Sequence, residues 1–270
     1  MVVTLFGDNA FGLQSELHKL VNGFVADYSD IGLERVDGEE AEFARISEAL
    51  TSLPFLVSKK LVVLRAPSAN KQFVESAENL LKDLPETIDV ILVEPKLDKQ
   101  SGYYKFLKKS MDFREFNELD INGLTRWLVE TAQQKNSDLS LADARFLVER
   151  LGLSQELLSN SLGVLLLASP KITREIIAQM TEPTPQSKIF DLLEAAFNGR
   201  TESALKLYDD QRAQNVEPLV IIAMIAWQLK ILAMIKAAGQ KSPAEIAKES
   251  KIKPYVISKN LTLARDLQLN

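Results

Sequence analysis

The chain has 270 residues, enough for about two domains, and 46% hydrophobic and 26% charged residues, the composition of a globular protein. It has no cysteine and a single histidine, His18, which excludes disulfides, thiolate metal sites, cysteine nucleophiles and most imidazole chemistry. The net charge of -5 argues against a protein whose whole surface grips nucleic acid. With no signal-like start and no apolar run near 18 residues, we expect a cytoplasmic protein that enters no membrane and holds no metal or cofactor.

The first segment predicts a strand, Val2 to Phe6, then a glycine-bearing turn and a helix. Gly7 and Gly12 are spaced as in a phosphate-binding loop, but Leu13 and Gln14 stand where its lysine and its hydroxyl residue belong. No ammonium is left for the phosphates and no hydroxyl for magnesium. We therefore expect a degenerate loop that binds no nucleotide, and a catalytic ATPase is disfavoured.

A second strand is predicted around Ile31 to Val36, followed by a helix with apolar residues at helical spacing up to Leu53. Pro54 should end that helix, and Leu61 to Leu64 predict a strand buried on both faces of a parallel sheet. The residues between are expected to form a short turn or helix, with Ser52 as a possible cap.

Phe55 and Leu56 fall in this connection and leave the register of the preceding apolar stripe. Connections at a sheet edge usually lie on the surface, so two adjacent large apolar residues there form a candidate exposed patch. The alternative is that both side chains simply cover the sheet, because large apolar residues are most often buried.

A helix is predicted over Asn70 to Leu84 and a strand over Ile88 to Val93, which ends in Glu94. Without the lysine of the first loop this carboxylate has no ATP to act upon, so we expect it to be solvated. In the following segment, residues 96–109, aromatic and basic residues alternate, a pattern found in nucleic-acid-binding sites. A solvated helix face over packed aromatics explains the same pattern. The candidate DNA-contacting residues are Lys96, Lys99, Lys105, Lys108 and Lys109.

A last strand is predicted at Phe113 to Phe116, and the alternation of strands and helices up to this point indicates a mostly parallel sheet. From Asn122 onward the pattern is wholly helical, and residues 181–185, with two prolines, indicate a linker. Near the end, residues 242–260 have the helix, turn, helix rhythm of a DNA-reading motif. A DNA-binding regulator that uses residues 242–260 is therefore kept as an alternative function.

The segment Ser52-Leu53-Pro54-Phe55-Leu56, followed by Ser58-Lys59-Lys60-Leu61, resembles the clamp-binding segment of the delta subunit of the bacterial DNA polymerase III clamp loader. The resemblance implies that Phe55 and Leu56, with Leu53 beside them, insert into a hydrophobic pocket of the ring-shaped sliding clamp. They would help to open one of its interfaces during DNA replication. It also implies a subunit without an active site of its own, inside a DNA polymerase holoenzyme.

The resemblance implies an α/β plus all-α architecture in three parts. Residues 1–119 would form a degenerate AAA+-type nucleotide-binding domain that carries the clamp-binding element. Residues 120–182 would form a small helical lid-like domain, in which Trp127 matches a tryptophan of the motif at the start of that domain. Residues 183–270 would form a helical collar. Implied partners are the beta subunit that forms the clamp, the gamma/tau and delta prime subunits through the collar, and primed DNA indirectly.

Two departures from the family are visible in the sequence. Residues 159–167 replace an acidic, lysine-bearing segment, so the resemblance carries no role over to them. Most of the family also continues beyond Asn270, so we expect a shortened collar and weakened or partner-dependent assembly.

Overall fold

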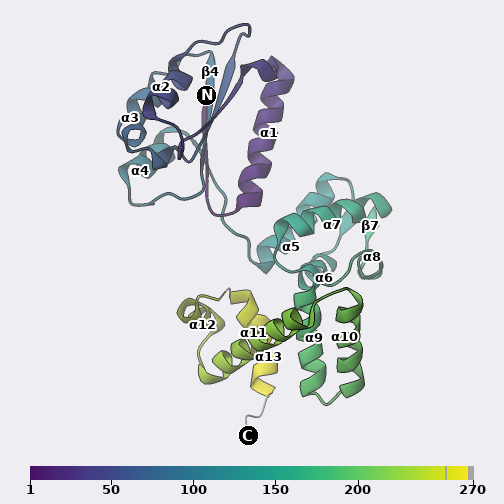
Figure 1. Ribbon diagram of the computed structural model, residues 1–270. Helices are drawn as coiled ribbons and strands as arrows, with labels where there is room; N and C mark the ends of the chain where they lie inside the picture. Colours follow the sequence, from purple (N-terminus) through teal and green to yellow (C-terminus); the bar gives the residue numbers. More distant parts are fainter. Residues whose placement is uncertain (253, 267–270) are drawn as a thin grey trace. The chain divides into compact units, whose positions relative to one another are not determined.

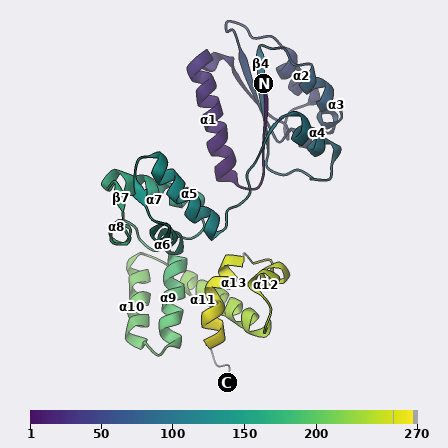
Figure 2. The ribbon, with the colours of Figure 1, turned by 180° about the vertical axis from the view of Figure 1, so that it is seen from behind.

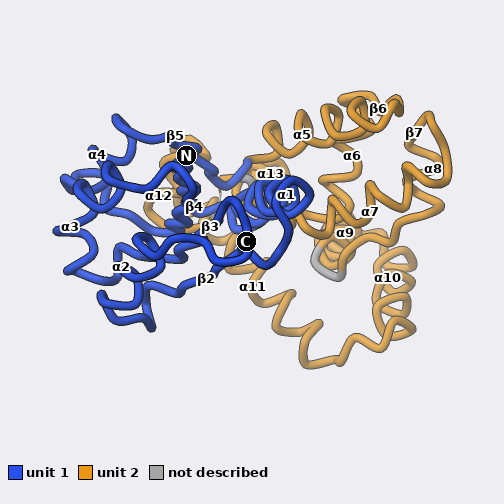
Figure 3. Tube along the Cα trace, turned by 90° about the horizontal axis from the view of Figure 1, so that it is seen from above, with its two compact units in different colours: residues 1–119 blue, residues 120–270 orange. Residues whose placement is uncertain are grey.

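The computed structural model of the chain describes residues 1–252 and 254–266. Lys253, in the segment with helix-turn-helix rhythm, and positions 267–270 of the predicted collar therefore lie outside the described residues. The chain forms two compact units, Met1–Leu119 and Asp120–Asn270, coloured blue and orange in Figure 3. A further division near residue 183 stays a prediction.

The first unit is built on one parallel five-stranded sheet, which confirms the predicted α/β fold. Its spatial order is β2-β3-β4-β1-β5. The strands are β1 Val2–Phe6, β2 Leu33–Asp37, β3 Lys60–Arg65, β4 Ile88–Glu94 and β5 Asp112–Glu115.

Helices cover both faces of this sheet, as parallel strands require (Figures 1 and 2). Along β3, Leu61 and Val63 pack on the α1 side, whereas Val62 and Leu64 join the core beneath α2 and α3. This alternation explains why the strand reads as an unbroken apolar run. The helices are α1 Ala10–Tyr28, α2 Phe43–Thr51, α3 Lys71–Lys82 and α4 Gly102–Ser110.

The second unit begins with a group of helices whose starts are capped by short polar side chains. Asp120, Ser140 and Ser154 each accept a backbone N–H from the first turn of the helix that follows. The elements are α5 Ile121–Gln134, β6 Asp138–Leu139, α6 Leu141–Leu151, α7 Gln155–Ala168, β7 Lys171–Ile172 and α8 Arg174–Met180. The strand β7, which directly precedes α8, pairs with β6 in parallel.

The remaining helices pack around α11 (Figure 1). They are α9 Pro185–Phe197, α10 Thr201–Ala213, α11 Pro218–Ala237, α12 Pro243–Ser250 and α13 Pro254–Asp266. By length and composition α11 could cross a membrane. Its residues Ile221, Ile231 and Ile235 are buried against other helices, while 28% of the apolar window as a whole is buried.

Two local predictions in the first unit are wrong. Asp30–Gly32 is a 3-10 helix, η1, so β2 begins only at Leu33. Residues 53–59 contain bends and no helix, so Ser52 caps no new helix but ends α2. A second 3-10 helix, η2 Pro67–Ala69, follows β3.

Candidate functional site

Residues 53–59, named here the Pro54 loop, connect α2 to β3 and display their large apolar side chains. Leu53, Phe55 and Leu56 are 70%, 81% and 79% exposed. The cores on both faces of the sheet are filled by other residues. The alternative that Phe55 and Leu56 cover the sheet therefore does not describe this structure.

Leu56 adopts a left-handed backbone conformation, with φ of 68°. For a bulky side chain this conformation is an outlier that costs on the order of 1 to 3 kcal/mol, and such outliers persist only where the surroundings hold them. A strained, exposed leucine in a connection is a physical indication of function.

Lys60 holds the base of the Pro54 loop. Its side chain is buried, and its Nζ donates to the carbonyl oxygen of Ala49 at 2.8 Å and to Oγ of Ser52 at 2.9 Å. It also pairs with Oε2 of Glu34 at 2.6 Å. Burial raises the pKa of Glu34, but Lys60 and Arg45 outweigh it and leave that pKa below its usual value. The two ends of the loop are thus joined through one buried ammonium.

The neighbouring Lys59 ties the loop to the sheet. Its Nζ lies 2.8 Å from Oδ2 of Asp89 and 5.6 Å from the ring centroid of Tyr28. The hydrogen bond to Asp89 raises the pKa of Lys59. Gly32 completes the contact, because a Cβ at this position would lie 2.5 Å from the carbonyl oxygen of Lys59. The loop between these anchors is therefore held from both sides.

The Gly7 loop follows the last residue of β1. It therefore lies at the end of the sheet where the strands finish, opposite to the end that carries the Pro54 loop. Gly7 has φ of 135°, and a Cβ there would lie 1.9 Å from the carbonyl oxygen of Phe116. The N–H of Gly7 donates to the main-chain carbonyl oxygen of Glu94 at 3.2 Å, and that of Asn9 to the carbonyl oxygen of Phe116 at 3.1 Å. Backbone N–H groups that a phosphate-binding loop keeps for its ligand are here used within the fold.

The other residues of this degenerate loop have equally ordinary partners. The N–H of Gly12 donates to Oδ1 of Asn9 at 2.8 Å. Leu13 is buried in the core under α1. Gln14 is exposed, and its Nε2 lies 3.1 Å from Nε2 of His18. A cavity of about 650 Å³ opens beside Gly7, Leu13 and Gln14, and its cationic lining residues are Arg35, Arg65 and Lys96. The sequence position of the P-loop lysine is occupied by Leu13.

Glu94 corrects the expectation of a solvated strand end. It is fully buried, and its carboxylate accepts from Oγ of Ser68 at 2.6 Å, from the Ser68 N–H at 3.0 Å and from the hydroxyl of Tyr103 at 3.2 Å. Burial raises its pKa from 4.5 to about 7, although these donors favour the ionised form. The carboxylate is a buried polar centre between β4, η2 and α4.

The basic stretch around α4 is a solvated face over packed aromatics. Lys99 pairs with Oε1 of Glu115 at 2.7 Å, and Lys108 lies 3.3 Å from the hydroxyl of Tyr104. Tyr104 is buried, so its ring face is covered rather than offered to a base. Lys96, Lys105 and Lys109 are exposed. Tyr104 is thus not a stacking platform, and DNA contact at this stretch stays a prediction.

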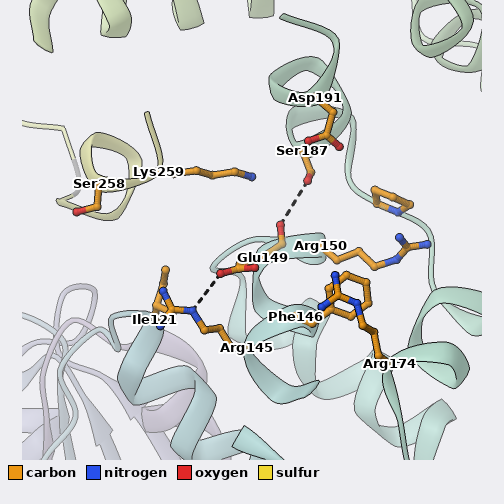
Figure 4. Close-up of a pocket in the computed structure, with 11 residues that line it drawn as sticks. Ile121, Arg145, Phe146, Glu149, Arg150, Arg174, Ser187, Asp191, Ser258 and Lys259 are labelled. Atoms are coloured by element: carbon orange, nitrogen blue, oxygen red, sulfur yellow. Dashed lines mark hydrogen bonds and ion pairs between the residues drawn. The ribbon is translucent and has the colours of Figure 1, made fainter. Parts of the chain in front are cut away.

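A cavity of about 430 Å³ in the second unit is lined by cationic side chains that already have partners (Figure 4). Arg150 donates to the carbonyl oxygen of Thr181 at 2.6 Å. The guanidinium of Arg174 lies 4.0 Å from the ring centroid of Phe146, and Nζ of Lys259 lies 4.8 Å from the ring centroid of Phe190. These contacts join α6 to α8 and to the segment after it, so we interpret the cluster as structural.

The segment 242–260 packs as part of the helical unit. Within the described residues, Ile246 of α12 and Ile257 and Leu263 of α13 are buried in one cluster with Ile231 and Ile235 of α11. Side chains that fill a core cannot also read base edges, so these buried residues are not base readers. The collar and the DNA-reading motif both stay predictions.

Sequence reasoning missed Lys60, Asp89 and Gly32 as parts of the site. The only signal was a lysine placed directly before an apolar strand, a position at which charged residues are usually solvated. Their partners come from α2, β2, β4 and η1, and no periodicity relates these segments.

Comparisons with known proteins agree with this architecture. The family model for DNA polymerase III, delta subunit, matches residues 4–117, and that for the DNA polymerase III delta subunit, C-terminal domain, matches residues 186–270. DNA polymerase III subunit delta of Bacillus subtilis (strain 168) is 24% identical over 286 residues, covering 98% of this chain and 81% of that protein. The solved Bacillus subtilis DNA clamp loader delta protein shares the fold, with a TM-score of 0.79 at 21% identity and coverage of 99% and 84%. The chain belongs to the DNA polymerase III delta subunit family.

Proposed function

We propose that this clamp-loader delta subunit binds the sliding clamp through Leu53, Phe55 and Leu56 and helps to open it. The observation that carries the proposal is the display of adjacent large apolar side chains on the Pro54 loop, which is anchored at both ends. Anchoring lowers the entropy lost when the side chains enter a pocket. A held loop with exposed apolar anchors is what insertion into a preformed apolar pocket requires.

The mechanism is differential binding. Burial of the Phe55 and Leu56 side chains would contribute about 3 to 6 kcal/mol. A ligand shifts a conformational equilibrium only by its difference in affinity for the two states. A clamp whose pocket accepts both side chains better when an interface is open would thus be biased toward opening. No covalent chemistry is needed.

The proposal includes no ATP binding by this chain. The N–H groups of Gly7 and Asn9 are bonded within the fold, and Leu13 is part of the core. Nucleotide would be bound by the partner subunits of the loader, which works on primed DNA in the cytoplasm.

Assembly with the gamma/tau and delta prime subunits is assigned to the helices around α11. One side of α11 packs on α9 and α13, but another side carries exposed apolar residues over about three turns. An exposed apolar stripe of this extent favours burial against other helices in an assembly. The exposed residues are Leu219, Val220, Ile222, Trp227 and Leu229.

The test replaces Phe55 and Leu56 together by serine and measures clamp affinity and stability in the full chain. Because both side chains are exposed, the free energy of unfolding should change by less than about 1 kcal/mol. Loss of both anchors should weaken clamp binding by about 100-fold or more in surface plasmon resonance.

A matched control replaces Val164 and Leu167, two exposed apolar residues of α7, by serine. This variant should bind the clamp like the parent. A Phe55→Ser, Leu56→Ser variant that keeps parental affinity would end the assignment, as would a parent chain that does not bind the clamp.

A further inference from the structure

The exposed large apolar side chains of the first unit lie at the end of its sheet where the strands begin, called here the N-terminal edge. This unit is described throughout, and they are Met1, Tyr28, Ile31, Leu53, Phe55 and Leu56. All of them come before a strand begins: Met1 before β1, Tyr28 and Ile31 before β2, and the other three before β3. Because the strands are parallel, these three segments emerge at the same edge of the sheet.

The turn before β2 touches the Pro54 loop directly. A Cβ on Gly32 would lie 3.3 Å from Cγ2 of Val57, besides its close approach to the carbonyl of Lys59. Lys59 also lies over the ring of Tyr28. Ile31 precedes Gly32, so its exposed side chain stands within one residue of the contact between the two segments.

Ile31 is presented on a fixed turn. It is 67% exposed, and its N–H donates to Oγ of Ser29 at 3.4 Å. Ser29 itself has φ of 79°, and its N–H donates to the carbonyl oxygen of Val25 at 3.0 Å, which ties the turn to the end of α1. A side chain on an ordered backbone loses little chain entropy when a partner covers it.

We propose that the clamp-binding surface extends beyond the Pro54 loop to Ile31, with Tyr28 beside it. The inference rests on the proposed function and commits to the same partner, the sliding clamp. The argument is continuity: a clamp that receives Phe55 and Leu56 at this edge must lie over the segment that contacts their loop. Phe55 and Leu56 fill the pocket, and Ile31 contacts an apolar surface at its rim.

The test is the change Ile31→Ser in the full chain, measured by surface plasmon resonance against purified clamp. Clamp affinity should fall by about tenfold, less than for loss of the two anchors, because Ile31 lies beside the central contact. Ile31→Met, which keeps an apolar side chain of similar size, should restore most of the affinity. Leu141→Ser, at an exposed apolar residue of the second unit, should leave affinity unchanged.

Amide hydrogen exchange provides a readout that needs no variant. On addition of the clamp, exchange should slow in peptides covering residues 28–33 as well as in those covering the Pro54 loop. If the Pro54 loop is protected and Phe55→Ser loses binding while residues 28–33 are unprotected and Ile31→Ser binds normally, the extension is wrong and the proposed function stands. If neither segment is protected and the parent does not bind, both fail.

Discussion

Glu94 gives the sharpest prediction about stability, because a fully buried carboxyl titrates near neutral pH. Its pKa is about 7 in the folded chain and 4.5 in the reference state. The folded chain therefore holds an extra proton between these two pKa values. Folding stability must fall as the pH rises through this window and stay lower above it. The difference in pKa corresponds to about 3 kcal/mol between pH 4 and pH 8.

The change Glu94→Gln removes this titration and keeps the shape of the side chain. We expect the variant to gain up to about 3 kcal/mol over the parent at pH 8 and to lose that advantage near pH 5, where the parent carboxyl is protonated. The hydroxyls of Ser68 and Tyr103 can reorient toward the amide.

The measurement is urea unfolding of parent and variant at several pH values, followed by far-UV circular dichroism. Tryptophan fluorescence is recorded in the same titration. Both tryptophans, Trp127 and Trp227, lie in the second unit, so a transition seen by circular dichroism but not by fluorescence reports unfolding of the first unit. Glu115→Gln is the matched control, an exposed strand-end glutamate whose pKa is lowered by its hydrogen bond to Lys99. A parent-to-variant difference that is equal at pH 5 and pH 8 would refute the reasoning.

Three further predictions concern the two edges of the sheet. Lys60→Met should destabilise the chain by about 1 to 3 kcal/mol in urea unfolding and speed amide exchange in the Pro54 loop, because Lys60 joins the ends of that loop; unchanged loop exchange would contradict this role. Gly7→Ala should lower the melting temperature, since its Cβ would overlap the Phe116 carbonyl, whereas Gly23→Ala on α1, where nothing lies within 4 Å, should raise it slightly. The isolated chain should give no binding heat with ATP and magnesium in calorimetry, and saturable micromolar binding would overturn the degenerate-loop argument.

The fold was largely predictable because its strands and helices follow from the local spacing of apolar residues in the sequence. The apolar runs of β3 and β4 lie where the pattern indicated. Glu94 could not be read in this way, since its burial depends on Ser68 and Tyr103, donors from two other segments.

The candidate site was predictable only in part. Proline and paired apolar residues mark the Pro54 loop, but the sequence left open whether Phe55 and Leu56 are displayed or buried. Exposure depends on how completely other residues fill the two cores. Ile31 is predicted within a strand, whereas the structure places it in the 3-10 helix η1.

The bridge from Lys60 to Ser52 has a consequence for protein engineering. Because Lys60 bonds to Ser52 at 2.9 Å and Lys59 pairs with Asp89 at 2.8 Å, the six residues 53–58 lie between two insertion points that the scaffold holds. Other six-residue sequences could be grafted between the same two points without altering β3. A library of such cassettes would present new apolar anchors to other protein pockets from the same edge of the sheet.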